Sequence, residues 1–537
     1  MPATLSYPGI YVEEVPSTVR TIAGVSTSDT AFVDCFARGP VDEAWRITSF
    51  ADFEREFGGL DQLSEASYAI QQFYLNQGQI AWVVRVGSGD PQTATVDLPA
   101  ATGSSPAIAL TLEAANAGAW GNGLQAAAVG VTLADGSIAT DRFNLVVREV
   151  EPAGPGKVNV LATEVFRNLN MTVGDRAYVK TVVDDGSQLA TVVDVQLGAI
   201  PLPATPDATG NGPDDDSAFA PFTGGTPGSA PTGNDLIGDP AAKTGMYALD
   251  RIAPFVFNLL CLPAAANLPT STDPAPLQNV YAAAETYCAD KRAFLLMDIP
   301  AAIDTAAEMG DYLKALEGLS LRSDHAAVYF PRLRIPDALQ DGRLRDVAAS
   351  GTLAGIYART DATRGVWKAP AGTDAVLTNA QLVVKLEDLE NGGLNPLGVN
   401  VLRNFPVFGN ISWGARTLDG ADQQASQWKY VPIRRTALYI EESLYQGLKW
   451  VVFEPNDEPL WAQIRMNVGA FMSTLFRQGA FQGNTPAKAY LVKCDGETTT
   501  QNDIDRGIVN ILVGFAPLKP AEFVVIRIQQ LAGQLET

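Results

Sequence analysis

Two textures of hydrophobic and polar positions alternate along the chain. In residues 25–91 and again in 241–370, short apolar runs are separated by longer stretches whose apolar positions recur every three or four residues. Uninterrupted apolar runs indicate buried strands, and the longer spacing indicates helices that cover them. These segments predict an α/β fold, with a mostly parallel or mixed sheet between helices.

The sequence predicts where individual strands and helices of these α/β segments lie. The run TAFVDCFARG predicts a buried strand, and FADFEREF predicts a helix with Ser49 as N-cap and Gly58 as its stop. A second helix is expected in EASYAIQQFYLNQGQ and a strand in IAWVVRV. Later in the chain we expect strands and helices to alternate in FVFNLLCLP, LQNVYAAAETYCADK, RAFLLMDIP, IDTAAEMGDYLKALEG and DHAAVYFPRLRI.

Residues 92–240 differ and predict an inserted, mainly β domain. Short β-type runs lie between Gly, Asp and Pro, without a good helix pattern. The runs are AIALTLEA, LQAAAVGVTLA, RFNLVVREV, KVNVLATEVF and AYVKTVV. The segment closes with residues 201–240, which hold eight prolines, seven glycines, six aspartates and no Lys or Arg. That composition predicts a solvated loop or linker.

The last third of the chain mixes both kinds of element. We expect strands in LGVNVLRNF, ISWGARTL and KWVVFEP, and helices around RRTALYIEESLYQG and EPLWAQIRMNVGAFMSTLFRQG. The second helix has Pro459 in its first turn and a single apolar stripe at 3.6-residue spacing. The stripe consists of Leu460, Ile464, Val468, Phe471 and Leu475.

Both ends of the chain read as strands without an obvious partner. The first, in YPGIYVEEVPS, is followed by a Ser/Thr-rich linker at residues 17–25, and the second follows APLKP near the other end. An unpaired strand exposes N–H and C=O groups that promote aggregation, unless it adds to the sheet of another subunit. The alternative is that both ends fold back onto the chain's own core. The candidate strand-addition residues are Ile10, Tyr11, Val12, Glu13, Glu14, Val15, Phe523, Val524, Val525, Ile526, Arg527 and Ile528.

Composition narrows the class of protein. At 537 residues, the chain predicts several domains, and 46% hydrophobic with 18% charged residues is typical of folded proteins. A net charge of -22 argues against nucleic acid or an anionic membrane as partner. No apolar run is long enough to span a membrane, and the first residues lack the pattern of a secretory signal. Four scattered cysteines are expected to be reduced and buried, in a protein made in the cytoplasm.

Motifs for catalysis or cofactor binding are missing from the sequence. The only histidine, His325, makes a His-based metal site improbable and cannot form a triad with its neighbours Ser323 and Asp324. GDPAAKTG lacks the glycines of a phosphate-binding loop. Asp214–Asp216 lack the ligand spacing of a calcium loop, and a paired-carboxylate glycosidase site stays open without a residue to mark it. We expect neither a cofactor nor an enzymatic activity.

Residues 459–494 stand out as the one basic segment, with Arg465, Arg477, Lys488 and Lys493 and no Asp or Glu. Arg465 and Arg477 lie off the apolar stripe, so they are candidates to face an acidic partner. The alternative is an ordinary amphipathic helix with solvated arginines.

Several motifs in the same order resemble those of contractile tail sheath proteins. Near the start they are YPGIYVEEVPS, IAGVSTSDTAFVDCFARGP and FADFEREFGG. Further along they are RGVWKAPAG, LNPLGVNVLR, YVPIRRTALYIEESL and VFEPNDEPLWAQIRMNVGAFMSTLFRQGAFQG. ANAGAWGNGL and FNLVVREV resemble the inserted domain of larger members. The resemblance covers about residues 1–90 and 245–537.

This resemblance implies a subunit of a helical polymer. Sheath subunits form hexameric discs that stack around an inner tube, on a baseplate and below terminator or cap proteins, and contract from a metastable extended state. In the family, both terminal arms complete the sheets of neighbouring subunits. The segment around 459–478 would then be a candidate for contact with the tube, through Arg465 and Arg477.

The resemblance and the hydrophobic patterns together predict the domain boundaries. We expect an arm and linker (1–24), a first core α/β segment (25–91), an inserted outer β domain (92–240), an α/β sheath domain (241–370), a C-terminal core sheath domain (371–520) and a C-terminal strand arm (521–537). Such a particle would be assembled in the bacterial cytoplasm. The alternative function is a receptor- or glycan-binding tail component, or an enzyme, that uses the inserted domain.

Overall fold

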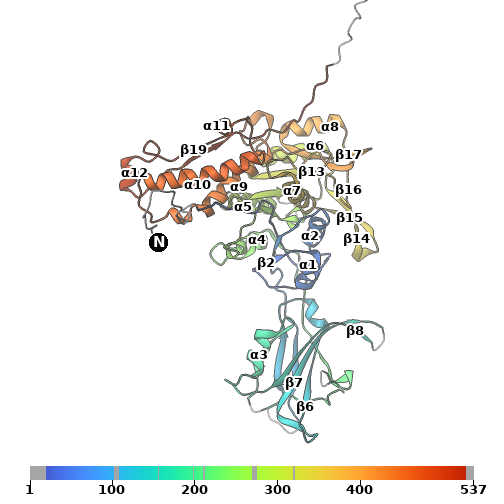
Figure 1. Cartoon of the computed structure of the whole chain (residues 1–537). Helices are drawn as coiled ribbons and strands as arrows, with labels where there is room; N and C mark the ends of the chain where they lie inside the picture. The colour runs from blue at the N-terminus through green and yellow to red at the C-terminus, as the bar shows by residue number, and fades with distance from the viewer. Residues whose placement is uncertain are drawn as a thin grey trace, which may run out of the picture.

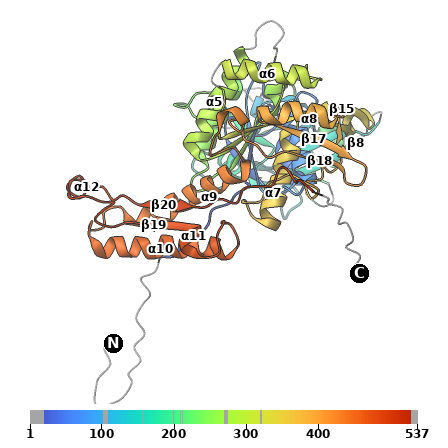
Figure 2. The ribbon, with the colours of Figure 1, turned by 90° about the horizontal axis from the view of Figure 1, so that it is seen from above.

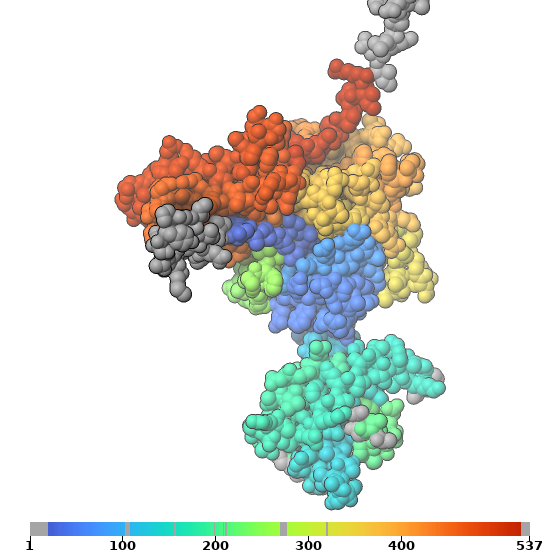
Figure 3. Space-filling model, viewed as in Figure 1, coloured from blue at the N-terminus to red at the C-terminus, as the bar shows by residue number. Residues whose placement is uncertain are grey.

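A body, a lower lobe and a side extension make up the molecule. The computed structural model describes residues 20–101, 108–154, 157–197, 199–207, 209, 212–268, 275–318 and 321–527. Figure 1 shows the lobe of residues 92–226, here the β lobe, joined to the body by a narrow connection. Residues 431–517 form an elongated C-terminal subdomain that extends sideways from the body, as the surface view in Figure 3 also shows.

One eight-stranded sheet organises the body, in the order β18-β17-β13-β12-β11-β1-β3-β2. Neighbouring strands from β17 to β3 run parallel, while β18 and β2 pair antiparallel at the two edges. This mixed sheet confirms the predicted α/β fold. In chain order the strands are β1 (Thr30–Asp34), β2 (Ala44–Ile47), β3 (Ala81–Arg85), β11 (Leu259–Cys261), β12 (Phe294–Met297), β13 (Ala326–Phe330), β17 (Val399–Phe405) and β18 (Gly409–Ser412).

Helices pack on both faces of the sheet, and their ends follow the capping residues read from the sequence. The Ser49 side chain accepts a hydrogen bond from the Asp52 N–H, and Gly58 ends the first helix in a left-handed conformation, with φ of 91°. The helices of the body are α1 (Phe50–Phe57), α2 (Glu65–Leu75), α4 (Gly233–Ile237), α5 (Ala275–Lys291), α6 (Ala306–Gly318), α7 (Ser350–Arg364) and α8 (Asp388–Leu394).

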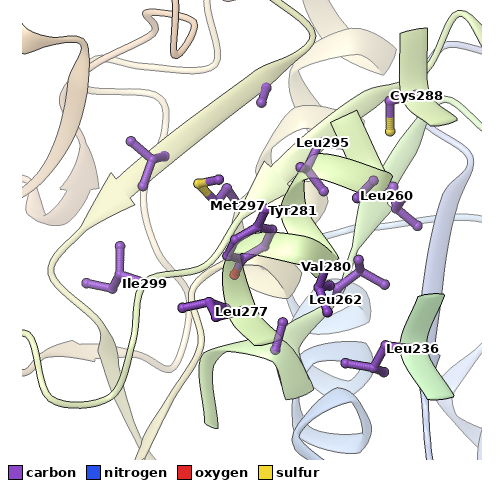
Figure 4. Close-up of a cluster of buried hydrophobic side chains, with 14 of the residues drawn as sticks. Leu236, Leu260, Leu262, Leu277, Val280, Tyr281, Cys288, Leu295, Met297 and Ile299 are labelled. Carbon is purple, nitrogen blue, oxygen red and sulfur yellow. The ribbon is translucent and has the colours of Figure 1, made fainter. Parts of the chain in front are cut away.

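Each face of the sheet has its own hydrophobic core. On one face α5 places Leu277, Val280 and Tyr281 over strands β11 and β12, as Figure 4 shows. On the other face, residues of α1, α2 and α7 cover the same strands. Because both faces are buried, the central strands are apolar without alternation, which is why the sequence shows them as continuous runs.

A small three-stranded sheet is attached to the body and joins β14 (Leu333–Asp337) to both β15 (Arg343–Val347) and β16 (Gln381–Leu382). The large sheet itself includes strands from both sides of residue 370. Leu236 of α4 lies in the core of the body, although it falls within the segment 92–240.

The β lobe has two sheets around a separate core. One has the order β4-β5-β9 and the other β10-β6-β7-β8. Their strands are β4 (Thr95–Pro99), β5 (Ile108–Ala114), β6 (Leu124–Thr132), β7 (Ile138–Pro152), β8 (Val158–Leu169), β9 (Ala190–Val195) and β10 (Ala220–Pro221).

One predicted strand of the β lobe is wrong. The run AYVKTVV enters helix α3 (Val179–Gly186), in which Val179 and Val183 are buried. The two valines are four residues apart and so lie on one helix face, and contact with the core outweighs the preference of β-branched residues for strands.

The C-terminal subdomain is built on two long helices, α9 (Val431–Gly447) and α10 (Glu458–Arg477). Strands β19 (Tyr490–Lys493) and β20 (Leu512–Phe515) lie along α10, as Figure 2 shows. Two short helices, α11 (Pro486–Ala489) and α12 (Gln501–Asp505), complete it. Among the described residues, no helix is long and apolar enough to cross a membrane.

A second predicted strand, KWVVFEP, is also wrong. Residues Lys449–Val451 form a single 3-10 turn directly after α9, and the chain then turns towards α10. Trp450 and Val451 pack against the core of the subdomain, so their apolar character reflects burial in a turn and not pairing in a sheet.

Candidate assembly surface

The sheet of β19 and β20 covers one side of α10. Tyr490 pairs with Phe515 and Val492 with Val513, and these four side chains pack towards α10. On the opposite face Leu491 and Leu512 are exposed. The alternation of inner and outer side chains fixes the register of the pair.

Both edges of this sheet lack a further strand in the part of the chain that the structure describes. The sheet contains β19 and β20 alone, with an isolated bridge from Phe481 to Pro517 beyond the end of β20. A two-stranded sheet is marginal in isolation and presents unpaired backbone N–H and C=O groups along its edges. Free edges of this kind are the geometry that strand addition requires.

Helix α10 gives this sheet a rigid base. The Asp457 side chain caps its first turn by accepting from the Leu460 N–H. The predicted stripe is confirmed, since Leu460, Ile464, Val468, Phe471 and Leu475 are all buried in the subdomain core.

The two candidate arginines differ in their surroundings. Arg465 donates to the Cys494 carbonyl and, at 2.5 Å, to the Glu458 carboxylate, so it ties α10 to the end of β19. Arg477 is exposed and has one hydrogen bond, 3.3 Å to the Thr474 hydroxyl. Arg477 is therefore the freer of the two to meet a partner.

The described chain begins on this same subdomain. Arg20 stacks on the Trp450 ring at 4.8 Å, and Ile22 is buried in the core beside Gly447. The close fit continues at Gly24, where a Cβ atom would lie 2.0 Å from the Tyr439 hydroxyl. The candidate residues Ile10, Tyr11, Val12, Glu13, Glu14 and Val15 lie outside the described residues.

At the other end, Glu522 fixes the chain to the body. Arg416 is fully buried and donates to both carboxylate oxygens of Glu522 at 2.7 Å. Burial alone would lower the pKa of Arg416, but the hydrogen bonds and charge of Glu522 raise it above its usual value. Tyr430 also donates to Glu522, at 3.1 Å, and burial followed by the charge of Glu522 raises the pKa of Tyr430 to about 12. We call this contact the Arg416–Glu522 clasp.

Directly after the clasp, the chain presents apolar side chains to solvent. Phe523, Val524, Val525 and Ile526 are each 76–81% exposed, and no strand pairing is found for them within the described residues. Arg527 is exposed as well, and Ile528 lies outside the described residues. The predicted strand over Phe523–Ile528 stays a prediction.

His325 and Asp216, two of the residues considered for catalysis or metal binding, are held by other side chains. Both ring nitrogens of His325 have partners, Asp324 at 2.6 Å and Arg434 at 2.7 Å. Asp216 pairs with Arg148 at 2.8 Å. Across the described residues, no group of three His, Cys, Asp or Glu side chains could hold a metal ion. The four cysteines are free and buried, as predicted.

The C-terminal part of the chain is similar to a known family, and longer segments are similar to individual proteins. Residues 423–530, which contain α9, α10, β19 and β20, match the family of phage tail sheath C-terminal domains. A tail sheath protein of Vibrio phage KVP40 is 25% identical over 186 residues, 34% of this chain and 26% of the relative. A prophage major tail sheath protein of Pseudomonas aeruginosa is 26% identical over 253 residues, 46% of this chain and 60% of the relative. The matches thus span about a quarter and three fifths of these relatives.

Solved structures match nearly the whole chain. The sheath complex of the extracellular contractile injection system PVC, in its contracted state, has a TM-score of 0.56 at 20% identity and 98% coverage of both chains. The contracted helical sheath of the anti-feeding prophage also has a TM-score of 0.56, at 22% identity, with 98% of this chain and 100% of that chain covered. A sheath tail protein of Listeria innocua has a TM-score of 0.57 at 13% identity, with 93% and 96% covered.

The fold is that of the contractile tail sheath proteins. The resemblance read from the sequence motifs is thereby confirmed. Within this sheath fold, the match at residues 423–530 covers the C-terminal subdomain, the clasp residue Glu522 and the exposed apolar residues after it. The sequence did not reveal the Arg416–Glu522 clasp, because 106 residues separate its partners. The sheath motifs, by contrast, did point to the subdomain.

Proposed function

We propose that the chain is the structural sheath subunit of a contractile particle, a phage tail or a phage-tail-like injection system. In this role it polymerises as stacked hexameric rings around an inner tube and contracts to drive the tube through a target envelope. The observation that supports this most directly is an open-edged sheet, β19 with β20, in a chain whose whole fold matches sheath complexes.

The open sheet supplies the acceptor for strand addition, and the chain ends supply the donors. Ile10–Val15 and Phe523–Ile528 have the alternating or continuous apolar pattern of strands, and Phe523–Ile526 are exposed in the single chain. Strand addition pairs backbone groups at the free edges of β19 and β20 and covers apolar side chains on both partners. Each subunit would thereby complete the sheet of its neighbours.

Contraction then needs two packings of the same subunits that differ in free energy, with a barrier between them. A difference of about 2–3 kcal/mol per subunit, the scale of one or two side-chain contacts, amounts to hundreds of kcal/mol over a long polymer. Backbone ladders between subunits persist while the connecting segments change their path. The subdomains can therefore move as rigid bodies without dissociation.

The particle would have further partners. One structural neighbour is a chain in the baseplate of the anti-feeding prophage, matched with a TM-score of 0.54 over 98% of this chain. We propose a baseplate, an inner tube protein and a terminator or cap protein as partners of this chain. Assembly in the bacterial cytoplasm fits the four free cysteines.

Truncation tests the strand-addition step. A chain lacking residues 1–19 keeps Arg20 on Trp450 and Ile22 in the core, so it should fold with unchanged circular dichroism. It should fail to form sheaths under conditions in which the full chain forms them, as seen by electron microscopy. Normal sheaths from the truncated chain would contradict this account.

Charge reversal tests the tube contact. Arg465→Glu combined with Arg477→Glu should weaken co-assembly with the inner tube more than assembly of the sheath alone, because both side chains lie off the buried stripe and Arg477 is exposed. Lys314→Glu, on the exposed face of α6 and paired with Asp311, is a control of the same charge change. Equal loss of both assemblies would assign the arginines to packing between sheath subunits.

A further inference from the structure

The turn between α9 and α10 holds an exposed aromatic side chain in a strained backbone conformation. Phe453 has a φ of +70° and is fully exposed, and Val452 beside it is also largely exposed. A left-handed conformation is strained for a residue other than glycine. No packing of Phe453 within the described chain offsets this strain, so the benefit must come from elsewhere.

The turn is held firmly in this shape. The Glu454 N–H donates to the Val451 carbonyl at 3.1 Å, and the Asn456 side chain donates to the Ile508 carbonyl at 3.0 Å. The Trp461 indole donates to Asn456 at 2.9 Å. Phe453 is therefore presented on a fixed support, with the acidic residues Glu454, Asp457 and Glu458 following it. We call residues 452–458 the Phe453 loop.

A cleft of complementary character lies where the C-terminal subdomain meets the body. It has a volume of about 790 Å³ and includes the aromatic side chains of Trp367, Trp413 and Tyr430. Three cations, Arg364, Lys368 and Lys519, lie in its lining, where the one acidic side chain, Glu522, is already paired with Arg416. Arg364 also lies 3.5 Å from the Asp374 carboxylate, so Lys368 and Lys519 carry the local excess of positive charge in a chain of net charge -22.

The loop and the cleft lie at opposite ends of α10. Asp457 of the loop caps the start of the helix, whereas Gln478, directly after its end, lines the cleft. A 20-residue helix is about 30 Å long, so the loop of one chain cannot reach its own cleft. Two different surfaces that fit each other make a head-to-tail contact, which extends into a ring or a helix instead of closing as a dimer.

We propose that the Phe453 loop of one copy docks into the Trp367–Trp413 cleft of a second copy. Phe453 enters between the aromatic side chains, and the acidic residues of the loop face Lys519 and Arg364 at the rim. This inference rests on the proposed polymeric function, which it deepens by naming one contact between copies. The cleft includes Ala521, Glu522 and Phe523 at the start of the C-terminal arm, whereas the Phe453 loop belongs to neither arm. Substitutions in the loop therefore test this contact separately from strand addition.

The test measures polymerisation of the full chain by sedimentation. Phe453→Ala should raise the concentration needed for polymerisation at least ten-fold, since a buried aromatic anchor carries much of the energy of an interface. Leu389→Ala, which truncates a largely exposed apolar side chain on α8, should leave this concentration unchanged. Glu454→Lys and Lys519→Glu should each weaken polymerisation, and the two together in one chain should restore part of it.

A photo-crosslinking amino acid at position 453 identifies what the loop meets. The expected product joins position 453 to the segments around Trp367 or Trp413 of another copy. Crosslinks to the inner tube protein, to a different surface or to nothing would overturn the proposal, as would a Phe453→Ala chain that polymerises normally. If the unmodified chain does not polymerise, the proposed function fails, and the crosslink at high protein concentration still decides the contact, since two copies are enough.

Discussion

Arg416 illustrates how one side chain can decide where an arm leaves the molecule. It is fully buried, and besides Glu522 it donates to Asp422 at 3.0 Å and to the Asn395 carbonyl at 2.8 Å. The clasp thus fixes residue 522 to the body, although β20 belongs to the C-terminal subdomain. Force on the residues after Glu522 would be passed to the large sheet.

Loss of the clasp should be costly. Glu522→Ala should lower the free energy of unfolding by about 3 kcal/mol, because it leaves a buried guanidinium without its bidentate partner. Chemical denaturation measures the change. Asp311→Ala, which removes one partner of an exposed pair with Lys314, should have no clear effect. Equal stability of both variants would show that Glu522 does not anchor the chain.

The buried carboxyl group of Glu285 should make the stability of the protein depend on pH. Glu285 is buried, and its Oε1 atom has no hydrogen-bond partner in the described chain. Burial raises the pKa of Glu285 from 4.5 to about 7. The folded protein therefore binds the proton more tightly than the unfolded chain, so the stabilisation is full below pH 4.5 and is lost as the pH rises through 7.

Glu285→Gln should remove this pH dependence. At pH 8 the variant should exceed the parent in free energy of unfolding by about 1–3 kcal/mol, and at about pH 4.5 the two should be nearly equal. Denaturation at a series of pH values measures the difference, with the exposed Glu317→Gln as control. A difference that does not vary with pH would contradict the buried, uncharged state of Glu285.

At the scale of elements, local sequence predicted most of the fold. The capping pair Ser49 and Gly58 defined α1, and continuous apolar runs located the central strands. The two errors, at AYVKTVV and KWVVFEP, concern valine-rich runs whose conformation is decided by the core they meet. Strand propensity depends on the neighbouring elements against which a segment packs, and a short apolar run does not show which elements those will be.

The surfaces between elements could not be predicted in the same way. The stripe of α10 follows from spacing alone, but the cleft at its far end combines Trp367, Trp413 and Lys519 from distant parts of the chain. The edges of β19 and β20 are free because no further strand of the described chain pairs with them. Such features arise from tertiary arrangement, and the sequence signals only the unpartnered ends.

Residues 20–25, at the start of the described chain, lie close against helix α9. Gly24→Ala places a Cβ atom against the Tyr439 hydroxyl and should destabilise the subdomain by about 1–3 kcal/mol. Tyr439→Phe removes the hydroxyl and should restore part of this loss when combined with it. Thermal unfolding measures both. An additive effect of the two substitutions would show that residues 20–25 do not lie against α9.

In the whole molecule, the buried sheet and the exposed surfaces available to other chains lie in different parts. The large sheet is buried on both faces, while the C-terminal subdomain holds the first described residues, the Phe453 loop and a sheet whose edges pair with no further strand of the described chain. The β lobe has its own core and a narrow connection to the body, as Figure 1 shows. We therefore propose that assembly depends on the C-terminal subdomain, and we expect a chain that lacks the β lobe still to polymerise.

Electron cryomicroscopy of the polymer formed by the purified full-length chain tests this account most directly. We expect a helical sheath in which a strand from a neighbouring copy pairs with each free edge of β19 and β20. Both ends of each chain would leave their own subunit in such a map. A map in which both ends pair only within their own chain, with the edges of β19 and β20 bare, would contradict it.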